Sequence, residues 1–472
     1  MRTKSATSVL LITAAATVLS GLTAAAATAS SASSASPGAT GGGDPYFPRQ
    51  GNGGYNVAHY DLRIAYTPSS HHLAGVATIR ARATQALSRF DLDLRRNLHV
   101  RSVTVNGAKA SFRQPKSLVQ ELVITPRHAL RNGRSFTVRV TYAGTAKHIN
   151  DPDGSADGFI VTKDGAFVAS EPQGSPTWFP VNDKPADKAT YAVTVTVPKG
   201  LTAVSNGAYL GKHTVGGLTT WRWRLDRRVS SYLVTATIGK FAVRQGRTPG
   251  GVPYFIAVDP TVKKQADPVL KKLPAIVDFY SRQFGKYPFG QAGAIVDNAP
   301  FVGYALETAT RPVFDRAPSI ETLSHELAHQ WFGDDVTLRR WRHIWLNEGF
   351  AEWASWRWDG HRGATTTAQH LKNLLAIPAS NKSEWLPPPA HPGDAAGIFS
   401  GSVYDRGAGT LETLRQAVGG ATFLKILRGW VRNHAYSTGT VAEFRAYAQK
   451  VAHRDLSHLF YEWLDKNGKP SA

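Results

Sequence analysis

Two histidines and two glutamates in the second half of the chain form the strongest chemical pattern. The sequence reads His325-Glu-Leu-Ala-His329, and eighteen residues separate His329 from Glu348. Because a helix brings positions i and i+4 onto one face, one turn apart, the two imidazoles can share one ion. Two histidines and one glutamate form a known ligand set of catalytic zinc, which leaves a fourth position for water. We therefore predict one Zn²⁺ per chain, bound by His325, His329 and Glu348.

Glu326 follows the first histidine directly, so it points about a quarter turn away from the imidazole face. From there it can reach a water molecule on the metal, which predicts the role of general base. The alternative is a solvated helix that carries these residues by accident. A second helical pattern at 347–358, which contains Glu348, makes the zinc interpretation the favoured one. Glu352, one turn beyond Glu348, either orients a ligand or faces solvent.

Two periodicities divide the rest of the chain into domains that must position these residues. From 45 to 245 apolar and polar residues alternate, as at 136–142 and 193–197, and Asn-Gly turns separate the runs. This alternation predicts an N-terminal antiparallel β domain. From 246 to 472 the apolar spacing is mainly helical, and the helix that carries the histidines should end at Gly333. We therefore expect an α+β protein with a mainly helical second domain.

The first residues have the three parts of a secretory signal peptide, namely basic residues, a short apolar run and small residues near Ala29. We expect cleavage of residues 1–29, a disordered linker at 30–44, and a secreted, extracellular protein. The apolar run is too short to span a bilayer, which argues against stable membrane insertion. The chain has no cysteine, so its stability must come from a large core rather than from disulfides.

The chain is strongly basic, with a formal net charge of +21. Such a charge could attract nucleic acid, anionic cell-wall polymers or acidic peptides. However, the densest groups, at 224–228 and 339–342, are short, and no nucleic-acid-binding module is present. A solvated basic face is therefore the favoured interpretation, and we expect no nucleic-acid partner.

Several motifs together resemble the zinc aminopeptidases of the aminopeptidase N and leukotriene-A hydrolase family. They are the His325 and Trp345-Leu-Asn-Glu348 segments described above, Trp178-Phe-Pro-Val-Asn-Asp-Lys-Pro-Ala-Asp-Lys, and Val403-Tyr404-Asp-Arg-Gly. The resemblance covers most of the chain after the signal peptide. It implies a saddle-shaped β domain, a thermolysin-like gluzincin catalytic domain, and removal of single residues from peptide N-termini. It also implies a short, secreted bacterial member without the long helical C-terminal domain of larger relatives.

The same resemblance implies roles for five further residues. Tyr404 looks like the tyrosine that donates to the oxyanion, although alone it would be read as a packing residue. Glu307 looks like the glutamate of the Gly-x-Met-Glu-Asn motif, which pairs with the free ammonium group of the substrate. This segment reads Tyr304-Ala305-Leu306-Glu307-Thr308 here, so it departs from the motif, and Ala305 and Leu306 are expected to bind substrate. Glu171 matches a second carboxylate on the substrate side.

Three functions are consistent with these residues. The favoured one is a monomeric zinc aminopeptidase that acts on peptides with a free N-terminus, with Glu326 and Tyr404 as catalytic residues. The altered 304–308 segment leaves open a peptidase that has lost its restriction to N-termini. The alternative from another class is a catalytically idle zinc protein that binds cell-wall polymer or a protein partner. Pure binding would need neither Glu326 nor Tyr404, which argues against it.

Overall fold

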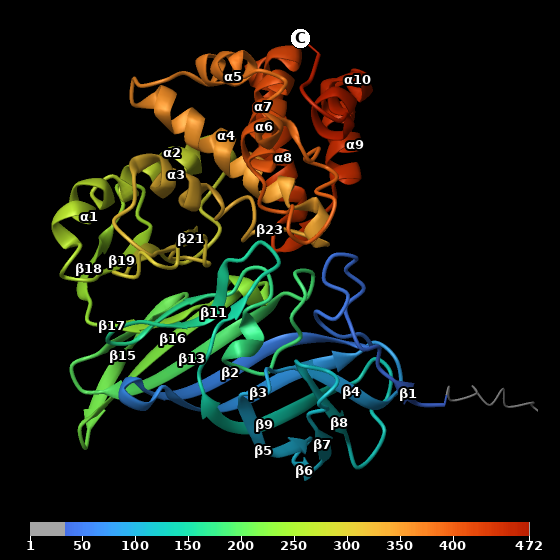
Figure 1. The fold of residues 1–472 in the computed structure, drawn as a ribbon, viewed down its shortest axis with the longest axis vertical. Coiled ribbons are helices and arrows are strands. Elements are labelled where there is room, and N and C mark those ends of the chain that lie inside the picture. The colour runs from blue at the N-terminus through green and yellow to red at the C-terminus, as the bar shows by residue number, and fades with distance from the viewer. Residues whose placement is uncertain (1–33, 472) are drawn as a thin grey trace, which may run out of the picture. The chain divides into compact units, whose positions relative to one another are not determined.

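An eight-stranded sheet forms the main layer of the N-terminal half of the computed structural model, which describes residues 34–471 (Figure 1). Its strands run in the order β15-β16-β13-β2-β3-β9-β5-β6, and only β13 and β2 pair in parallel. Phe136, Val138, Val140 and Tyr142 of β9 are buried, whereas their neighbours are less so, as the alternation predicted. The strands are β2 (Tyr55–Thr67), β3 (His72–Ala83), β5 (Leu98–Val105), β6 (Ala108–Lys109), β9 (Ser135–Thr145), β13 (Ala189–Pro198), β15 (Ala208–Val215) and β16 (Leu218–Val229).

Two smaller sheets complete this β domain. One has the order β1-β4-β8-β7 and the other β10-β11-β12-β17-β14. Their strands are β1 (Ser36–Pro37), β4 (Leu87–Asp93), β7 (Ser111–Arg113), β8 (Glu121–Thr125), β10 (Ile149–Asn150), β11 (Ala156–Val161), β12 (Ala166–Ala169), β14 (Thr202–Ser205) and β17 (Ala236–Gly239).

A mixed sheet of order β18-β19-β20-β22-β21 opens the second domain, and helices form most of the remainder. Its strands are β18 (Ala242–Arg247), β19 (Pro253–Val258), β20 (Ala292–Val296), β21 (Ala305–Leu306) and β22 (Val313–Phe314), and a separate pair joins β23 (Val336–Leu338) to β24 (Ser437–Gly439). The helices are α1 (Lys263–Leu270), α2 (Leu273–Phe284), α3 (Ile320–Ala328), α4 (Trp345–His361), α5 (Thr367–Ala376), α6 (Lys382–Trp385), α7 (Gly401–Val418), α8 (Gly420–His434), α9 (Val441–Ala452) and α10 (Ser457–Phe460). The predicted β domain followed by a mainly helical domain is confirmed.

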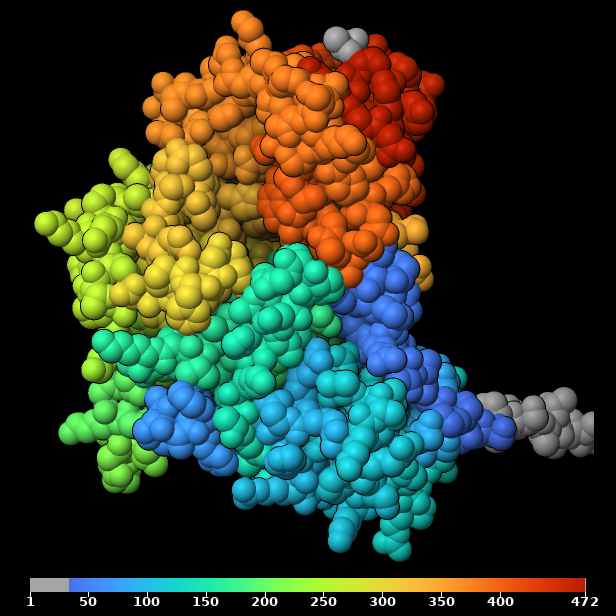
Figure 2. Space-filling view, viewed as in Figure 1, coloured from blue at the N-terminus to red at the C-terminus, as the bar shows by residue number. Residues whose placement is uncertain are grey.

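The two domains are joined by buried polar contacts as well as by the chain. The Nζ of Lys188, just before β13, donates to the carbonyls of Asp334 and Asp335, at 3.0 and 2.7 Å, and to the Thr337 hydroxyl at 2.8 Å. Asp44 accepts the backbone N–H of Trp341 at 2.8 Å. Figure 2 shows the blue surface at the start of the described residues directly against the orange surface of the C-terminal helices.

The structure differs from the sequence-based expectation at three boundaries. Residues 36–37 form β1, which pairs with β4 of the β domain, and the buried Asp44 side chain binds the Trp341 N–H, so residues 36–44 are ordered where a disordered linker at 30–44 was expected. The domain boundary expected at 245 falls inside β18. Helix α3 ends at Ala328 rather than at Gly333, which adopts a φ of +135° five residues later. The predicted signal peptide, residues 1–29, lies outside the described residues.

Candidate metal centre

Helix α3 presents the two histidines from a buried segment with a defined start. Ser319 caps its N-terminus by accepting the Thr322 N–H at 3.0 Å. His325 lies in its last turn, and His329 is the C-cap residue that follows Ala328. The helical backbone therefore still sets the i, i+4 spacing, although the helix is shorter than expected.

The three predicted ligands converge with the correct atoms. The Nε2 atoms of His325 and His329 lie 3.1 Å apart, and Oε2 of Glu348, in the first turn of α4, lies 3.3 and 3.4 Å from them. All three side chains are buried or nearly so. For a tetrahedral zinc ion with bonds of about 2.0–2.1 Å, neighbouring ligand atoms are about 3.3 Å apart. The triangle therefore has the size that zinc requires.

The opposite ring nitrogens of both histidines have partners that fix the rings. His325 Nδ1 lies 3.0 Å from Oε2 of Glu352, whose other oxygen accepts the Trp356 indole N–H at 2.8 Å. His329 Nδ1 lies 3.0 Å from the Phe332 carbonyl oxygen. Since both partners are acceptors, each Nδ1 carries the proton and each Nε2 lone pair faces the centre of the triangle. Of the two readings of Glu352, the structure supports the one in which it orients a ligand.

Three further carboxylates lie beside the triangle, of which Glu326 is adjacent to His325 in the chain, whereas Glu171 and Glu307 come from more distant segments. Ligand atoms of Glu307, Glu326 and His329 lie within 4.8 Å of one another, and so do those of Glu171, Glu307 and Glu348. Burial raises the pKa of Glu326 to about 7, and burial followed by the charge of Glu307 raises the pKa of Glu171 well above its ordinary value. The ionised forms of these carboxyl groups are therefore unfavourable on their own, and a cationic group placed among them would stabilise them.

Glu171 and Glu307 are poised for such a cationic group. They are 7% and 2% exposed, and in the described part of the chain one oxygen of each, Oε1, is buried without a hydrogen-bond partner. A buried carboxylate oxygen without a donor is costly, and two beside each other are more so. An ammonium group placed between them would supply both the donors and the positive charge.

Tyr404 lies on the first turn of α7, next to the first histidine. Its ring stacks on that of His325, with centroids 5.8 Å apart and planes 25° apart. Burial, followed by the charges of Glu348 and Glu171, raises the pKa of its hydroxyl well above the ordinary value, so the hydroxyl keeps its proton. The hydroxyl is therefore available as a hydrogen-bond donor near the metal triangle.

Ala305 and Leu306 form β21, the edge strand of the β18-β19-β20-β22-β21 sheet, directly before Glu307.

The role of Gln330 was not identified from the sequence. Gln330, adjacent to His329, accepts the Thr310 N–H at 2.8 Å and donates to the Glu307 carbonyl at 3.3 Å. Its amide therefore ties the Glu307 segment to the metal helix. A polar residue directly after the second histidine in an otherwise apolar stretch was the available hint.

The comparisons with known proteins agree with this geometry. A model described as the peptidase M1 N-terminal domain matches residues 56–233, and one described as the peptidase family M1 domain matches residues 305–463. Aminopeptidase M1-B of Oryza sativa subsp. japonica is 27% identical over 87% of this chain, and aminopeptidase M1-D of the same plant is 29% identical over 66%. This chain spans 50% and 38% of the length of these two relatives.

Solved structures cover more of the chain. The M1 zinc metallopeptidase from Deinococcus radiodurans is 28% identical, with a TM-score of 0.80, and the match covers 91% of this chain and 98% of that one. A variant of that protein bound to a Tyr-Ser-Ala substrate aligns with a TM-score of 0.83. Both domains and their order are thus those of one family, and the chain belongs to peptidase family M1.

Proposed function

We propose that this protein is a zinc aminopeptidase that removes single residues from peptides with a free N-terminus. The observation that carries the proposal is the position of Glu171 and Glu307. One carboxylate oxygen of each lies within 4.8 Å of a ligand atom of Glu348, and each residue has a buried oxygen without a hydrogen-bond partner among residues 34–471. A substrate held there by its ammonium group has its first peptide bond near the metal, whereas an internal bond brings no ammonium group to this position.

When bound at this triangle, zinc lowers the pKa of a water molecule and polarises the scissile carbonyl. Glu326 takes the proton from the attacking water and then gives it to the departing amine. The Tyr404 hydroxyl donates a hydrogen bond to the carbonyl oxygen as negative charge develops there. Glu352 keeps His325 in the required tautomer throughout, since its carboxylate accepts the Nδ1 proton.

Strand β21 offers a place for the backbone of the substrate peptide next to the scissile bond. As an edge strand it has one row of backbone groups without a strand partner, at Ala305 and Leu306, on which a peptide can pair as an added strand. The side chain of Tyr304, where the family motif has glycine, is fixed through its hydroxyl, which donates to the Ala156 carbonyl at 2.7 Å. The strand therefore retains a defined position despite its altered sequence.

Export and oligomeric state are part of the proposal. The basic, apolar and small-residue sequence of the first 29 residues supports secretion of the enzyme, which we propose to be a monomer. Among the described residues, no helix is both long and apolar enough to cross a bilayer. N-terminal sequencing of the protein recovered from the culture medium, together with light scattering, tests both points. An uncleaved N-terminus in a cell-retained protein, or a stable dimer, would contradict them.

The decisive assay uses two peptides of identical sequence, one with a free and one with an acetylated N-terminus, with the zinc-loaded and the chelator-treated protein. The proposal predicts zinc-dependent release of the first residue from the free peptide alone. Cleavage of both peptides would be consistent with zinc-dependent hydrolysis but would contradict the role of Glu171 and Glu307 as ligands of the substrate ammonium group. Cleavage of neither peptide by protein that retains zinc would favour a binding protein.

A further inference from the structure

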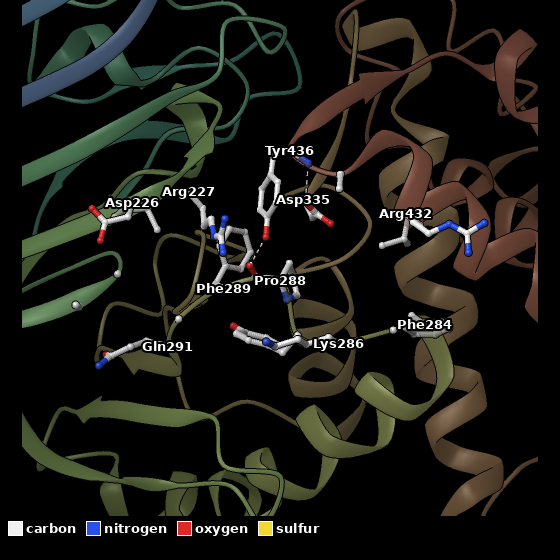
Figure 3. A pocket seen from close by; sticks show the side chains of 18 of the residues that line it. Asp226, Arg227, Phe284, Lys286, Pro288, Phe289, Gln291, Asp335, Arg432 and Tyr436 are labelled. Carbon is white, nitrogen blue, oxygen red and sulfur yellow. Dashed lines mark hydrogen bonds between the residues drawn. The ribbon is translucent and has the colours of Figure 1, made fainter.

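One cavity of the described residues, with a volume of about 850 Å³, is lined by residues other than the proposed zinc ligands and their neighbouring carboxylates (Figure 3). Its walls come mainly from strand β16, the segment 284–291 between α2 and β20, and helix α8 with the residues that follow it, and Gly207, Ala208 and Asp335 complete the lining. Neither the metal ligands nor Glu171 and Glu307 line it. A volume of this size is typical of ligand-binding pockets.

Positive charge dominates the lining, with five cationic side chains against the carboxylates of Asp226 and Asp335. Two of the cations are already engaged. Arg224 pairs with Asp226 at 3.0 Å, and Arg428 donates to two backbone carbonyls at the end of α2, at 2.8 Å each. The other three, Arg227, Lys286 and Arg432, have no carboxylate within salt-bridge distance among residues 34–471.

A fixed aromatic floor lies between these three cations. Tyr436 is held at both ends, because its hydroxyl donates to the Pro288 carbonyl at 2.7 Å and its backbone N–H donates to Asp335 at 2.7 Å (Figure 3). The Arg227 guanidinium lies over its ring, 4.9 Å from the centroid. Phe289 beside it is 6% exposed. Because the floor does not need to be ordered by a ligand, binding would cost little conformational entropy.

The arrangement of the three cations restricts the kind of ligand. They belong to three different elements, and Figure 3 shows Arg227 and Arg432 on opposite sides of Tyr436. One small anion cannot contact both sides at once, whereas an extended chain with several negative groups can. Guanidinium groups bind carboxylates through paired hydrogen bonds, and the apolar surface between them suits apolar side chains.

From these observations we propose that the cavity binds an acidic peptide segment, with its carboxylates on Arg227, Lys286 and Arg432 and an apolar side chain on Tyr436. The site is separate from the proposed hydrolytic centre and does not depend on turnover. The overall charge of +21 would steer such a segment to the protein.

Isothermal titration calorimetry of the whole, zinc-loaded protein tests the proposal with the hexapeptide acetyl-Glu-Leu-Glu-Glu-Leu-Glu-amide. Its blocked N-terminus prevents it from acting as an aminopeptidase substrate. The test variant is Arg227→Gln/Arg432→Gln. The matched control, Arg340→Gln/Arg342→Gln, removes the same charge from exposed arginines outside the cavity. Thermal melting shows that each variant is folded.

We expect the hexapeptide to bind the wild type and the control equally, and to bind the test variant at least about tenfold more weakly, because charge-assisted hydrogen bonds are lost. Replacing its glutamates by glutamines should weaken binding as strongly. The absence of binding, or an equal loss in the control variant, would overturn the proposal. Equally tight binding of inorganic phosphate would do the same, since it would indicate a site for a single anion.

Discussion

The substitution Glu307→Gln isolates the proposed role of this carboxylate, because it keeps the size of the side chain and removes its charge. Glu307 is 2% exposed and its Oε1 has no hydrogen-bond partner among the described residues, so water compensates little for a lost substrate ammonium group. Hydrogen bonds to charged groups contribute about 1.5–3 kcal/mol, which corresponds to a loss of about 10- to 150-fold in kcat/KM. Since a Glu171 oxygen lies within 4.8 Å of one of Glu307, the lower half of this range is expected.

The assay compares a free N-terminal substrate with its des-amino analogue, which lacks only the ammonium group. The variant should lose activity on the first substrate and cleave the second as slowly as the wild type does. Glu321→Gln, an exposed residue of the same metal helix segment, is the control and should leave both rates unchanged. A loss below about threefold, or an equal loss on both substrates, would refute the assignment of Glu307 as an ammonium ligand.

Four further predictions follow from the structure. Glu326→Gln should bind zinc normally, as measured by metal analysis, and lose about 10²- to 10⁴-fold in kcat, because it removes the general base; near-normal turnover would exclude that role. Tyr404→Phe should lower kcat about 10²-fold or more with little change in KM, because one donor to the developing charge is lost; a change in KM alone would contradict it. Lys188→Met should lower the free energy of unfolding by about 3–5 kcal/mol in denaturant titrations, because buried acceptors of the second domain lose their charged donor; a change below about 1 kcal/mol would contradict it. Burial, followed by the charges of Arg342 and Arg340, lowers the pKa of His343 to about 4, so the unfolded chain binds the proton more readily than the folded one. As the pH falls from 6.5 to 4, the free energy of unfolding of the wild type should therefore decrease by up to about 3 kcal/mol more than that of His343→Gln. An equal pH dependence of unfolding in the two proteins would contradict this.

The parts of the site that are close in sequence were predictable, because a helix fixes the relation of residues four apart. This applies to His325 and His329, and the spacing to Glu348 identified the third ligand. The strands were predictable for a similar reason, since the alternation at 136–142 directly reflects one buried and one less buried face. In each case a single local periodicity determines which side chains meet.

Contacts between distant segments had no such signal. Nothing in the residues around Glu171 shows that it lies beside Glu307, 136 positions later; only the family resemblance suggested both. Lys188 donates to backbone carbonyl groups of the second domain, and because every residue has such a group, the sequence does not indicate which ones will be the acceptors. Residues 36–44 contain few apolar side chains, but backbone pairing attaches β1 to the β domain, and the buried carboxylate of Asp44 binds Trp341 of the second domain.

The most direct test of the central claim is a time course of products from a decapeptide with a free N-terminus, followed by mass spectrometry with and without a zinc chelator. We expect a ladder in which single residues disappear in order from the N-terminus, and no cleavage after the chelator has removed the metal. Internal fragments at early times, or a ladder that persists without zinc, would contradict it.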